Sequence, residues 1–341
     1  MQSRREFLLK MALLSAGLAV PIAVHAKRED KYGELLPLRK LGNTGENVTM
    51  LGLGGFHIGQ PPEQEAQRII ETAIEKGIRF FDNAHNYWKG ESEVRYGKFL
   101  TPKFRDDVFI MTKTGAGDYR TAKEELERSL TRMKIDQVDL WQLHSLKDPI
   151  DVDNRIKNGV LKAVEEALKE KKIRYAGFTC HNSPRAMLRM LEQTGNSGLF
   201  STAQMPINVI DAYSNPSFIQ HVLPSLNKHN MGVLGMKSLA DGRFFKNKVR
   251  FGKEIWNIES PLIPDYISVE EAIQFAWTMP ISSLIVGPDN VDMLNEKIDF
   301  VTRMGKVNEE YRQKLIAKIT DYPLLKKVEY YKKDRDYTLM S

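Results

Sequence analysis

Four polar residues suited to proton transfer follow apolar segments in the first half of the chain. One apolar run ends on Asp82, and Tyr87 stands five residues later; the next two runs, VFIMTK and VDLWQLH, end on Lys113 and His144. A tyrosine phenol normally keeps its proton to about pH 10. A lysine ammonium beside it would lower that pKa, and a carboxylate would hold the lysine charged. The pattern predicts a proton-transfer site with Tyr87 as the acid.

An alternation of strand-like and helix-like segments positions these residues. Alternating strands and helices imply right-handed crossovers and a parallel sheet, and eight units favour an α/β fold closed into a (β/α)8 TIM barrel. Chemistry in such barrels lies at the carboxyl ends of the strands, where Asp82, Lys113 and His144 fall. The predicted strands are 48–53, 78–82, 107–112, 137–143, 173–178, 202–205, 231–236 and 283–287. The predicted helices are 63–76, 91–100, 121–132, 155–171, 183–193, 216–229, 268–279 and 290–303.

Three further segments accompany the eight units. Residues 42–45 predict the turn of an N-terminal hairpin. The long connection 240–267 follows the seventh strand, and such connections at the functional face usually face substrate or act as lids. Residues 307–341 predict a C-terminal extension with one helix, VNEEYRQKLIAKI, and a charged tail. The extension either folds over the barrel mouth or is a solvated end.

The first 26 residues predict an export signal that precedes a single barrel domain at 27–341. Paired Arg4 and Arg5 precede an apolar run that is broken by proline and closes on a small residue, Ala26. The string SRREFLLK resembles the twin-arginine signal, which the export machinery reads to move folded proteins into the bacterial periplasm. The apolar run is shorter than the roughly 20 residues of a membrane span. An uncleaved leader acting as a membrane anchor is the alternative.

The composition argues against several other classes of function. Beyond the leader the charges nearly balance, at net +4, and they are interspersed, which argues against a nucleic-acid or membrane-surface role. The only cysteine, Cys180, excludes an intrachain disulfide and a zinc–cysteine cluster. Stability therefore rests on the core, and a chain of this length buries about three quarters of its unfolded surface.

The motifs around the polar residues resemble those of the aldo-keto reductases over nearly all of the mature chain. The opening LGNTGENVTMLGLG, the element DNAHNY from Asp82 to Tyr87 and the following SEVRYGKFL match that family's patterns. Lys113 follows an apolar strand as the family lysine does, and DLWQLH places His144 at the family histidine position. The resemblance implies carbonyl reduction with Asp82, Tyr87, Lys113 and His144 as the catalytic set.

The resemblance also implies which residues face a nicotinamide cofactor, NADPH or NADH. Where the family has G-x-S-N this chain reads GFTC, so Cys180 replaces the amide, with His181 and Asn182 next door. Gly287 and Met293 stand at the usual lysine and arginine positions for phosphate, which leaves the choice between NADPH and NADH open. Asn208 matches the asparagine that follows the family glutamine. The cofactor positions are Gly55, Phe56, Asp82, Thr179, Cys180, Gln204, Met236, Lys237, Leu239 and Glu296.

Other candidate chemistries are weaker. His57, His85 and His181 lack metal-ligand spacing and cysteine partners, so we expect no metal site. Cys180 beside His181 lacks a further base-orienting element, so a small core residue is favoured over a nucleophile. The GLGG after the first strand lacks the G-x-G-x-x-G spacing and the acidic residue of a Rossmann fingerprint.

The expected function is reduction of a small aldehyde or ketone, with the proton from Tyr87, the lysine held by Asp82, and His144 orienting the carbonyl. Histidine at position 144 favours carbonyl reduction, because a relative that reduces steroid double bonds carries glutamate there. The periplasm has no obvious free nicotinamide pool, so we expect the cofactor to be loaded before export. A cofactor-binding barrel that serves as a sensor or partner subunit is the alternative. The mouth is expected to include Trp88, Phe244, Phe245 and Trp256.

Overall fold

The computed structural model describes residues 28–195, 197–250, 252–305 and 307–332, and the predicted leader lies outside them. Eight parallel strands pair in chain order, and the last pairs with the first, so the sheet is a closed barrel. The predicted (β/α)8 fold is confirmed. The strands of the barrel are β5 (Leu51–Gly54), β6 (Phe80–Asp82), β7 (Phe109–Thr114), β8 (Val138–Leu143), β9 (Ile173–Thr179), β10 (Thr202–Pro206), β11 (Gly232–Met236) and β14 (Ser283–Val286).

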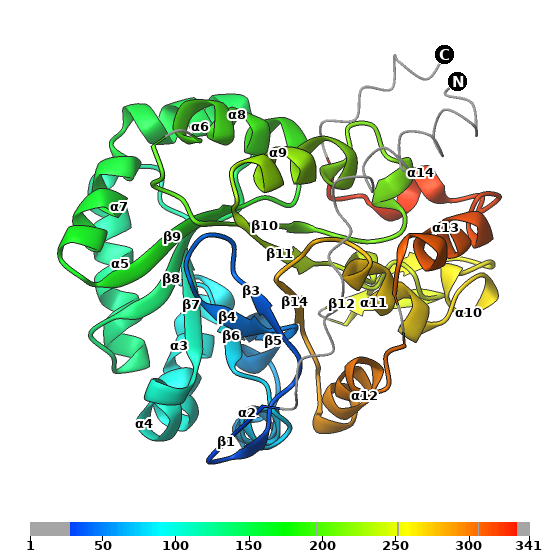
Figure 1. Cartoon of the computed structure of the whole chain (residues 1–341), viewed down its shortest axis with the longest axis horizontal. Helices are drawn as coiled ribbons and strands as arrows, with labels where there is room; N and C mark the ends of the chain where they lie inside the picture. Colours follow the sequence, from blue (N-terminus) through cyan, green and yellow to red (C-terminus); the bar gives the residue numbers. More distant parts are fainter. Residues whose placement is uncertain (1–27, 196, 251, 306, 333–341) are drawn as a thin grey trace.

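Helices surround the barrel (Figure 1). Several begin at a side chain that caps the free backbone N–H groups of the first turn, as Asp118 and Ser268 do. Their buried faces pack on the outside of the strands in the main core cluster. The helices are α2 (Glu63–Glu75), α3 (Glu91–Arg95), α4 (Thr101–Phe104), α5 (Tyr119–Met133), α6 (Pro149–Lys157), α7 (Val160–Lys169), α8 (Pro184–Thr194), α9 (Leu223–Lys228), α10 (Leu262–Asp265), α11 (Val269–Trp277), α12 (Val291–Thr302), α13 (Glu309–Lys318) and α14 (Leu325–Val328).

An N-terminal hairpin closes the amino end of the barrel. Its strands β3 (Leu38–Lys40) and β4 (Asn47–Thr49) pair antiparallel around the predicted turn, and a shorter pair, β1 (Glu29–Asp30) and β2 (Gly33–Glu34), precedes it. The single strand predicted at 48–53 is therefore wrong in one respect. The chain leaves the hairpin at Met50 and only then enters the barrel as β5, because one apolar run serves two sheets.

A second core cluster fills the barrel interior. Leu41 and Val48 of the hairpin pack with inward-facing side chains of the strands. Phe80 and Phe109 stack with ring centroids 5.3 Å apart. This plug leaves the carboxyl end as the open end of the barrel. The strand residues in the cluster are Phe80, Phe109, Met111, Leu140, Leu234 and Ile285.

The predicted helix boundaries need correction in the fourth unit. The helix predicted at 155–171 is two helices, α6 and α7, separated at Gly159, whose φ of 83° is left-handed. Glycine reaches that conformation without steric cost, so the chain turns there. The start of α6 was missed although its signals are present, since Asp148 caps it and Pro149 occupies its first turn.

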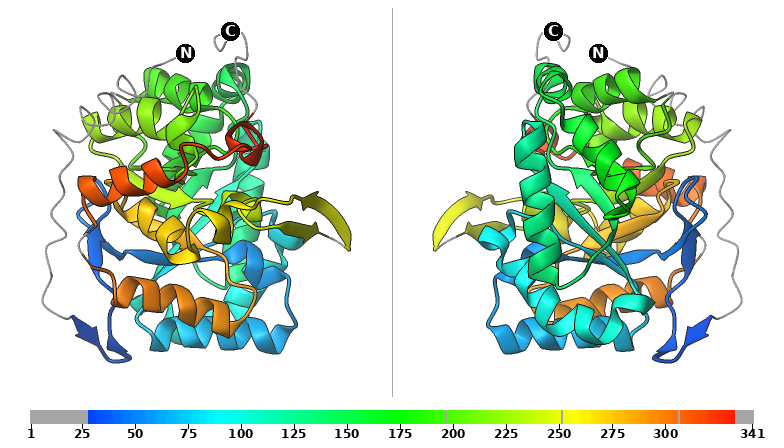
Figure 2. Two further views of the ribbon diagram at one scale, coloured as in Figure 1. Left: turned by 90° about the vertical axis from the view of Figure 1, so that its right-hand side faces the viewer. Right: turned by 90° about the vertical axis from the view of Figure 1, so that its left-hand side faces the viewer.

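The long connection after β11 carries a second hairpin. A turn at Ala240–Gly242 leads into β12 (Asn247–Arg250) and β13 (Lys253–Asn257), which pair antiparallel. Figure 2 shows this hairpin projecting from the body of the molecule. Its Arg250 reaches the Phe56 ring beyond the end of β5, at 6.0 Å from guanidinium carbon to ring centroid. The hairpin therefore lies at the functional end, as predicted for this segment.

The described part of the C-terminal extension packs against the loops that follow β10 and β11. The Lys332 ammonium is buried between the carboxylates of Asp211 and Glu329. The Tyr330 hydroxyl donates to Asp241 at 2.5 Å. Up to residue 332 the extension thus folds onto the carboxyl-end loops and is not a solvated end.

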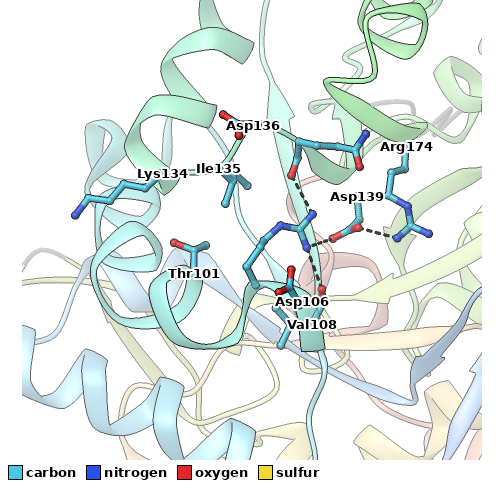
Figure 3. A pocket seen from close by; sticks show the side chains of 10 residues that line it. Thr101, Asp106, Val108, Lys134, Ile135, Asp136, Asp139 and Arg174 are labelled. Atoms are coloured by element: carbon cyan, nitrogen blue, oxygen red, sulfur yellow. Dashed lines mark hydrogen bonds and ion pairs between the residues drawn. The ribbon is translucent and has the colours of Figure 1, made fainter.

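A pocket of about 510 Å³ lies at the opposite, amino end of the strands (Figure 3). Its floor is Asp139, a buried residue at the start of β8 that accepts from Arg174 at 2.8 Å and from Arg105 at 3.0 Å. Asp139 also accepts from the backbone N–H of Ile110 at 2.8 Å. Asp139, the first residue of the DLWQLH element, therefore stabilises the amino end of the barrel, while His144, the last, lies at the carboxyl end.

Among the helices of the described residues, none has both the length and the apolar character needed to cross a membrane.

Candidate active site

The Lys113 ammonium ties together the polar residues at the ends of β6 and β7. It donates to the Asp82 carboxylate, to the Asn83 carbonyl oxygen at 2.7 Å and to the Tyr87 hydroxyl at 3.2 Å. An ammonium has three protons, so all three are used. Lys113 and Asp82 are buried, which requires such pairing because an unpaired buried charge is costly. The carbonyl of Asn83 is a partner that the sequence did not reveal.

Tyr87 stands at the rim of this cluster in a strained turn. The next two residues, Trp88 and Lys89, have φ of 51° and 57°. Non-glycine residues rarely adopt this left-handed region, and such strain is concentrated at functional sites. The Tyr87 ring lies edge-on to Phe56, with centroids 5.4 Å apart, and to His144, at 5.7 Å. The tyrosine is thus held between a lysine and a histidine.

The pKa of Tyr87 is shifted in the opposite direction from the one that the sequence predicted. Burial and the negative charge of Asp82 raise the pKa of Tyr87 well above its usual value, although Lys113 had been expected to lower it. The phenol therefore keeps its proton at neutral pH, as a general acid requires. Burial also raises the pKa of Asp82 and lowers that of Lys113, while the attraction between the two opposes both shifts.

His144 is a neutral imidazole in this environment. Burial, followed by the positive charge of Lys113, lowers its pKa well below the usual value. Its backbone N–H donates to the Thr114 carbonyl at 2.7 Å, and its own carbonyl accepts from Arg155 at 3.2 Å. These bonds fix the residue just beyond β8. A neutral ring keeps one N–H to donate toward a carbonyl oxygen.

A buried network from the SEVRYG element holds the 82–87 segment in place. The Tyr96 hydroxyl donates to the Asp82 carbonyl at 2.9 Å. Glu93, which is fully buried, accepts from Thr112 at 2.6 Å and from Arg132 at 3.1 Å. Arg132 also donates to the His85 carbonyl at 2.9 Å. The SEVRYG element was predicted only as a match to the family pattern; its role in positioning residues 82–87 appears in the structure.

Two predicted cofactor positions after β5 support the catalytic cluster directly. The Gly55 backbone N–H donates to the Asp82 carboxylate and lowers its pKa against the effect of burial. A Cβ atom at Gly55 would lie 2.3 Å from the Asp82 carbonyl oxygen, so no larger residue fits. Phe56 accepts from the Trp88 indole N–H at 2.8 Å through its carbonyl. These contacts give both residues a structural role as well.

The predicted nicotinamide positions on β9 and β10 differ in whether their side chains already have hydrogen-bond partners within the protein. The Thr179 hydroxyl accepts from the Ser145 N–H at 2.8 Å. Cys180 was predicted to face the cofactor, but its thiol is fully buried and donates to the Leu146 carbonyl at 2.9 Å. Its side chain is therefore part of the core, the role favoured over a nucleophile. By contrast, the buried Gln204 Oε1 has no hydrogen-bond partner among the described residues.

Asn208, after β10, is committed to the C-terminal segment. Its amide donates to Glu329 at 2.9 Å and to the Tyr331 hydroxyl at 3.1 Å. Its carbonyl oxygen accepts from the backbone N–H of Ile210 at 2.9 Å. This residue therefore anchors the C-terminal extension to the loop after β10.

The end of β11 supplies one apolar and one charged side chain. Met236, the last strand residue, is buried, and Leu239 is partly buried against the core. Lys237 has a left-handed φ of 55° and lies over the Tyr331 ring, 4.9 Å from its centroid. Its ammonium is 3.6 Å from Asp241. Burial lowers the pKa of Lys237, and Asp241 opposes that shift.

The loop after β14 is more acidic than a phosphate site requires. His57 pairs with Asp289 at 2.6 Å and fills the space beside Gly287, where a Cβ atom would lie 2.0 Å from the His57 ring. A lysine at position 287 would therefore displace His57. Glu296 is half exposed, 3.9 Å from Lys297. The ammonium of Lys297, which the sequence reasoning did not consider, donates to the Met293 carbonyl at 3.1 Å.

Three of the four aromatic residues expected at the mouth keep some exposure. Trp88, Phe245 and Trp256 are partly buried, and the Trp256 indole N–H donates to the Phe245 carbonyl at 3.0 Å. Phe244 was expected beside them but is fully buried in the main core cluster. Its ring packs inward because its carbonyl, which accepts from the Ile263 N–H at 2.9 Å, ties it to the start of α10.

Comparisons with known proteins agree with this architecture. The uncharacterized oxidoreductase YqkF of Bacillus subtilis is 25% identical over 306 residues, 80% of this chain and 94% of that protein. L-galactose dehydrogenase of Arabidopsis thaliana is 25% identical and covers 79% of this chain and 89% of its own length. The holo structure of aldo-keto reductase AKR11C1 from Bacillus halodurans superposes with a TM-score of 0.68 at 22% identity, covering 82% of this chain and 95% of that one. Because the profile of the aldo/keto reductase family matches residues 50–261, more than half of the sequence, the chain belongs to that family.

Proposed function

We propose that this protein reduces a small aldehyde or ketone to the alcohol, with Tyr87 as the general acid. The observation that carries the proposal is the contact of one buried ammonium, Lys113, with both the Asp82 carboxylate and the Tyr87 hydroxyl, at 3.2 Å for the latter. No helix capping or core-packing role needs that arrangement. Its chemistry matches the activity of the family to which the chain belongs.

Each residue of the cluster has a separate part in the proposed reaction. A reduced nicotinamide supplies the hydride when bound. Tyr87 gives its proton to the oxygen as negative charge develops there, and Lys113 stabilises the tyrosinate that remains. Asp82 holds the ammonium in place. His144, kept neutral by burial, donates to the same oxygen and fixes the direction of the carbonyl.

The residues of β9 and β10 fit a nicotinamide. Gln204, in the middle of β10 and beside the end of β9, places there a buried acceptor oxygen without a partner, and a carboxamide NH₂ is a group that can satisfy it. We propose that either NADH or NADPH is used without strong preference. The loop after β14, with Asp289, and the first two turns of α12, with Glu296, offer no guanidinium to pair with a 2′-phosphate.

Replacing Tyr87 by phenylalanine tests the assignment of the acid. The variant keeps the ring and its contacts with Phe56 and His144 but loses the proton. We expect turnover of a generic aldehyde to fall by about 10² to 10⁴, with cofactor affinity unchanged within about twofold. Tyr32→Phe, whose hydroxyl contacts Asp107 at the amino end, is the matched control. Near-normal turnover in Tyr87→Phe would remove this residue from the mechanism.

We also propose that the chain is exported by the twin-arginine route and works in the periplasm, with its cofactor loaded before export. The support is the leader sequence SRREFLLK with a small residue at Ala26. Residues 1–40 fused to a reporter that must fold before export should carry it to the periplasm. Arg4→Lys with Arg5→Lys should hold the reporter in the cytoplasm. Unchanged export in that double variant would mean that the leader works by another route or only as an anchor.

A further inference from the structure

Two buried polar atoms at the carboxyl end of β9 and β10 have no hydrogen-bond partner among the described residues. One is Gln204 Oε1 and the other is Nδ1 of His181. The two residues are close in the fold, because Gln204 pairs in register with Thr179 and its carbonyl accepts from the Cys180 N–H at 3.1 Å. Buried polar groups are usually partnered. Other atoms without a partner, such as Trp141 Nε1, lie in the core, but these two lie together at the open end of the barrel, where a ligand can reach them.

His181 belongs to the rim of the active site. Its ring centroid is 6.1 Å from that of His144, which in turn lies 5.7 Å from that of Tyr87. The charged groups that act on its pKa are Lys113 on β7, and Lys237 and Asp241 after β11. Burial and these lysines lower the pKa of His181 to about 3, so the ring is neutral and carries one N–H.

The residue just before His181 leaves a donor position open. Cys180 stands where an amide side chain would be expected, but its thiol is fully buried against the Leu146 carbonyl. A thiol is also a weak donor. A ligand group that needs a strong donor at this end of β9 must therefore find it in a neighbouring residue.

We propose that His181 replaces the missing amide and donates its Nδ1–H to the carboxamide oxygen of the nicotinamide, while Gln204 Oε1 accepts from the carboxamide nitrogen. A carboxamide has one acceptor oxygen and one NH₂ donor, which matches Gln204 Oε1 as the acceptor and His181 Nδ1 as the donor in the tautomer that carries the proton there. This inference rests on the proposed function, because it names the residues that hold the cofactor of that reaction.

Cofactor analogues separate the two hydrogen bonds. Reduced 3-acetylpyridine adenine dinucleotide keeps the carbonyl oxygen of the nicotinamide but has a methyl group in place of NH₂. Binding of this analogue and of NADH to the full mature protein is measured by quenching of tryptophan fluorescence. Gln204→Leu should weaken the affinity for NADH about five- to tenfold and leave the affinity for the analogue within about twofold of the wild-type value. His181→Phe should weaken both ligands about five- to tenfold, the size of one hydrogen bond.

A second variant and a control protect the result against misfolding. His181→Asn keeps an amide donor and should restore both affinities to within about threefold of the wild-type values. His221→Ala removes an exposed histidine of the helical turn Phe218–Val222 and should change neither affinity. Thermal unfolding of each variant shows whether the fold is intact.

Three results would overturn the inference. If His181→Phe binds both ligands normally but raises KM for the carbonyl compound, His181 contacts substrate instead. If His181→Phe weakens only NADH, the ring contacts the carboxamide nitrogen and the assignment is reversed. If the wild-type protein binds neither ligand, the proposed function fails and this inference fails with it; the first two results leave the proposed function standing.

Discussion

Two groups of polar residues at the barrel mouth differ in how they are partnered. On the side of β6, β7 and β8, the Lys113 ammonium uses all three of its protons, and Asp82 also accepts from the Gly55 N–H. On the side of β9 and β10, Gln204 Oε1 and His181 Nδ1 have no partner among the described residues. The Lys113 ammonium is thus fully partnered, although the neighbouring Asn83 Nδ2 is not, whereas Gln204 and His181 each keep an open polar atom.

Under the proposed function, this difference separates the residues that would do the chemistry from those that would bind the cofactor. A proton-transfer group must be held in one geometry before the substrate arrives, so its network is closed by the protein. A binding surface is completed by its ligand, so unpaired atoms remain. Departures from the family pattern, such as Cys180, Met236 and Gly287, fall on the binding side. The closed network leaves little freedom to vary, since each member holds another.

The largest expected effect comes from breaking the closed side at its centre. Lys113→Met removes the ammonium and leaves the Asp82 carboxylate buried without its partner. Loss of one member of a buried ion pair costs about 3–5 kcal/mol of unfolding free energy. Turnover should fall by at least about 10³, since Tyr87 also loses the group that stabilises its anion. Urea unfolding and steady-state kinetics measure both.

The control for that variant is Lys123→Met on α5, whose ammonium pairs with Glu166 at 2.7 Å on the surface. Surface pairs contribute about 0–1 kcal/mol, so this variant should resemble the wild type. Turnover of Lys113→Met within tenfold of the wild-type value would contradict the view that the closed network performs the chemistry.

A smaller effect is expected on the open side, in the choice of cofactor. The affinities for NADPH and NADH should lie within about tenfold, or about 1.4 kcal/mol, because Gly287 and Met293 supply no cation for the 2′-phosphate. Fluorescence titration measures both. A preference for NADPH of about a thousandfold would show that the phosphate site lies elsewhere, with Lys237 and Lys297 as the remaining candidates.

Restoring a guanidinium sharpens that comparison. Met293→Arg, in the first turn of α12, should raise the affinity for NADPH about tenfold relative to the affinity for NADH, because arginine pairs with phosphate through two parallel hydrogen bonds. Met304→Arg, after the end of α12, adds the same charge farther along the chain and should leave the ratio unchanged. An equal gain in both variants would indicate a general electrostatic effect.

The smallest effect is a dependence of stability on pH. Burial lowers the pKa of His144 well below the usual value of about 6.5 and that of His181 to about 3. Between pH 6.5 and those values the unfolded chain binds protons that the folded protein does not. Unfolding free energy should therefore decrease as pH falls below 6.5, by up to about 1.4 kcal/mol per pH unit for each histidine.

The window from pH 6.5 to 5 tests this with little interference from most carboxylates. Urea unfolding of the wild type should show a steeper slope there than that of His181→Phe, which lacks one of the histidines whose pKa burial lowers; His85 is another. Equal slopes in the two proteins would mean that His181 is protonated normally in the folded state.

The sequence alone determined the fold and four polar residues that the structure brings together at the barrel mouth. Eight apolar runs alternate with amphipathic segments, and eight such strand–helix units favour a closed parallel barrel. Asp82, Lys113 and His144 could be assigned to one end of it because each follows such a run. Parallel strands bring their carboxyl ends together whatever lies between them, so local pattern was sufficient.

Only the tertiary structure decided which side chains face the site and what their surroundings do to them. Cys180 and Phe244 are apolar or weakly polar residues in loops, and their burial depends on neighbours distant in sequence. The pKa of Tyr87 is raised by burial and by the negative charge of Asp82. No sequence motif specifies how deeply the ring is buried or how far it lies from that charge. The unpartnered atoms of His181 and Gln204 likewise become visible only when every possible partner has been placed. Burial and charge both depend on three-dimensional distance, and spacing along the chain does not determine that distance.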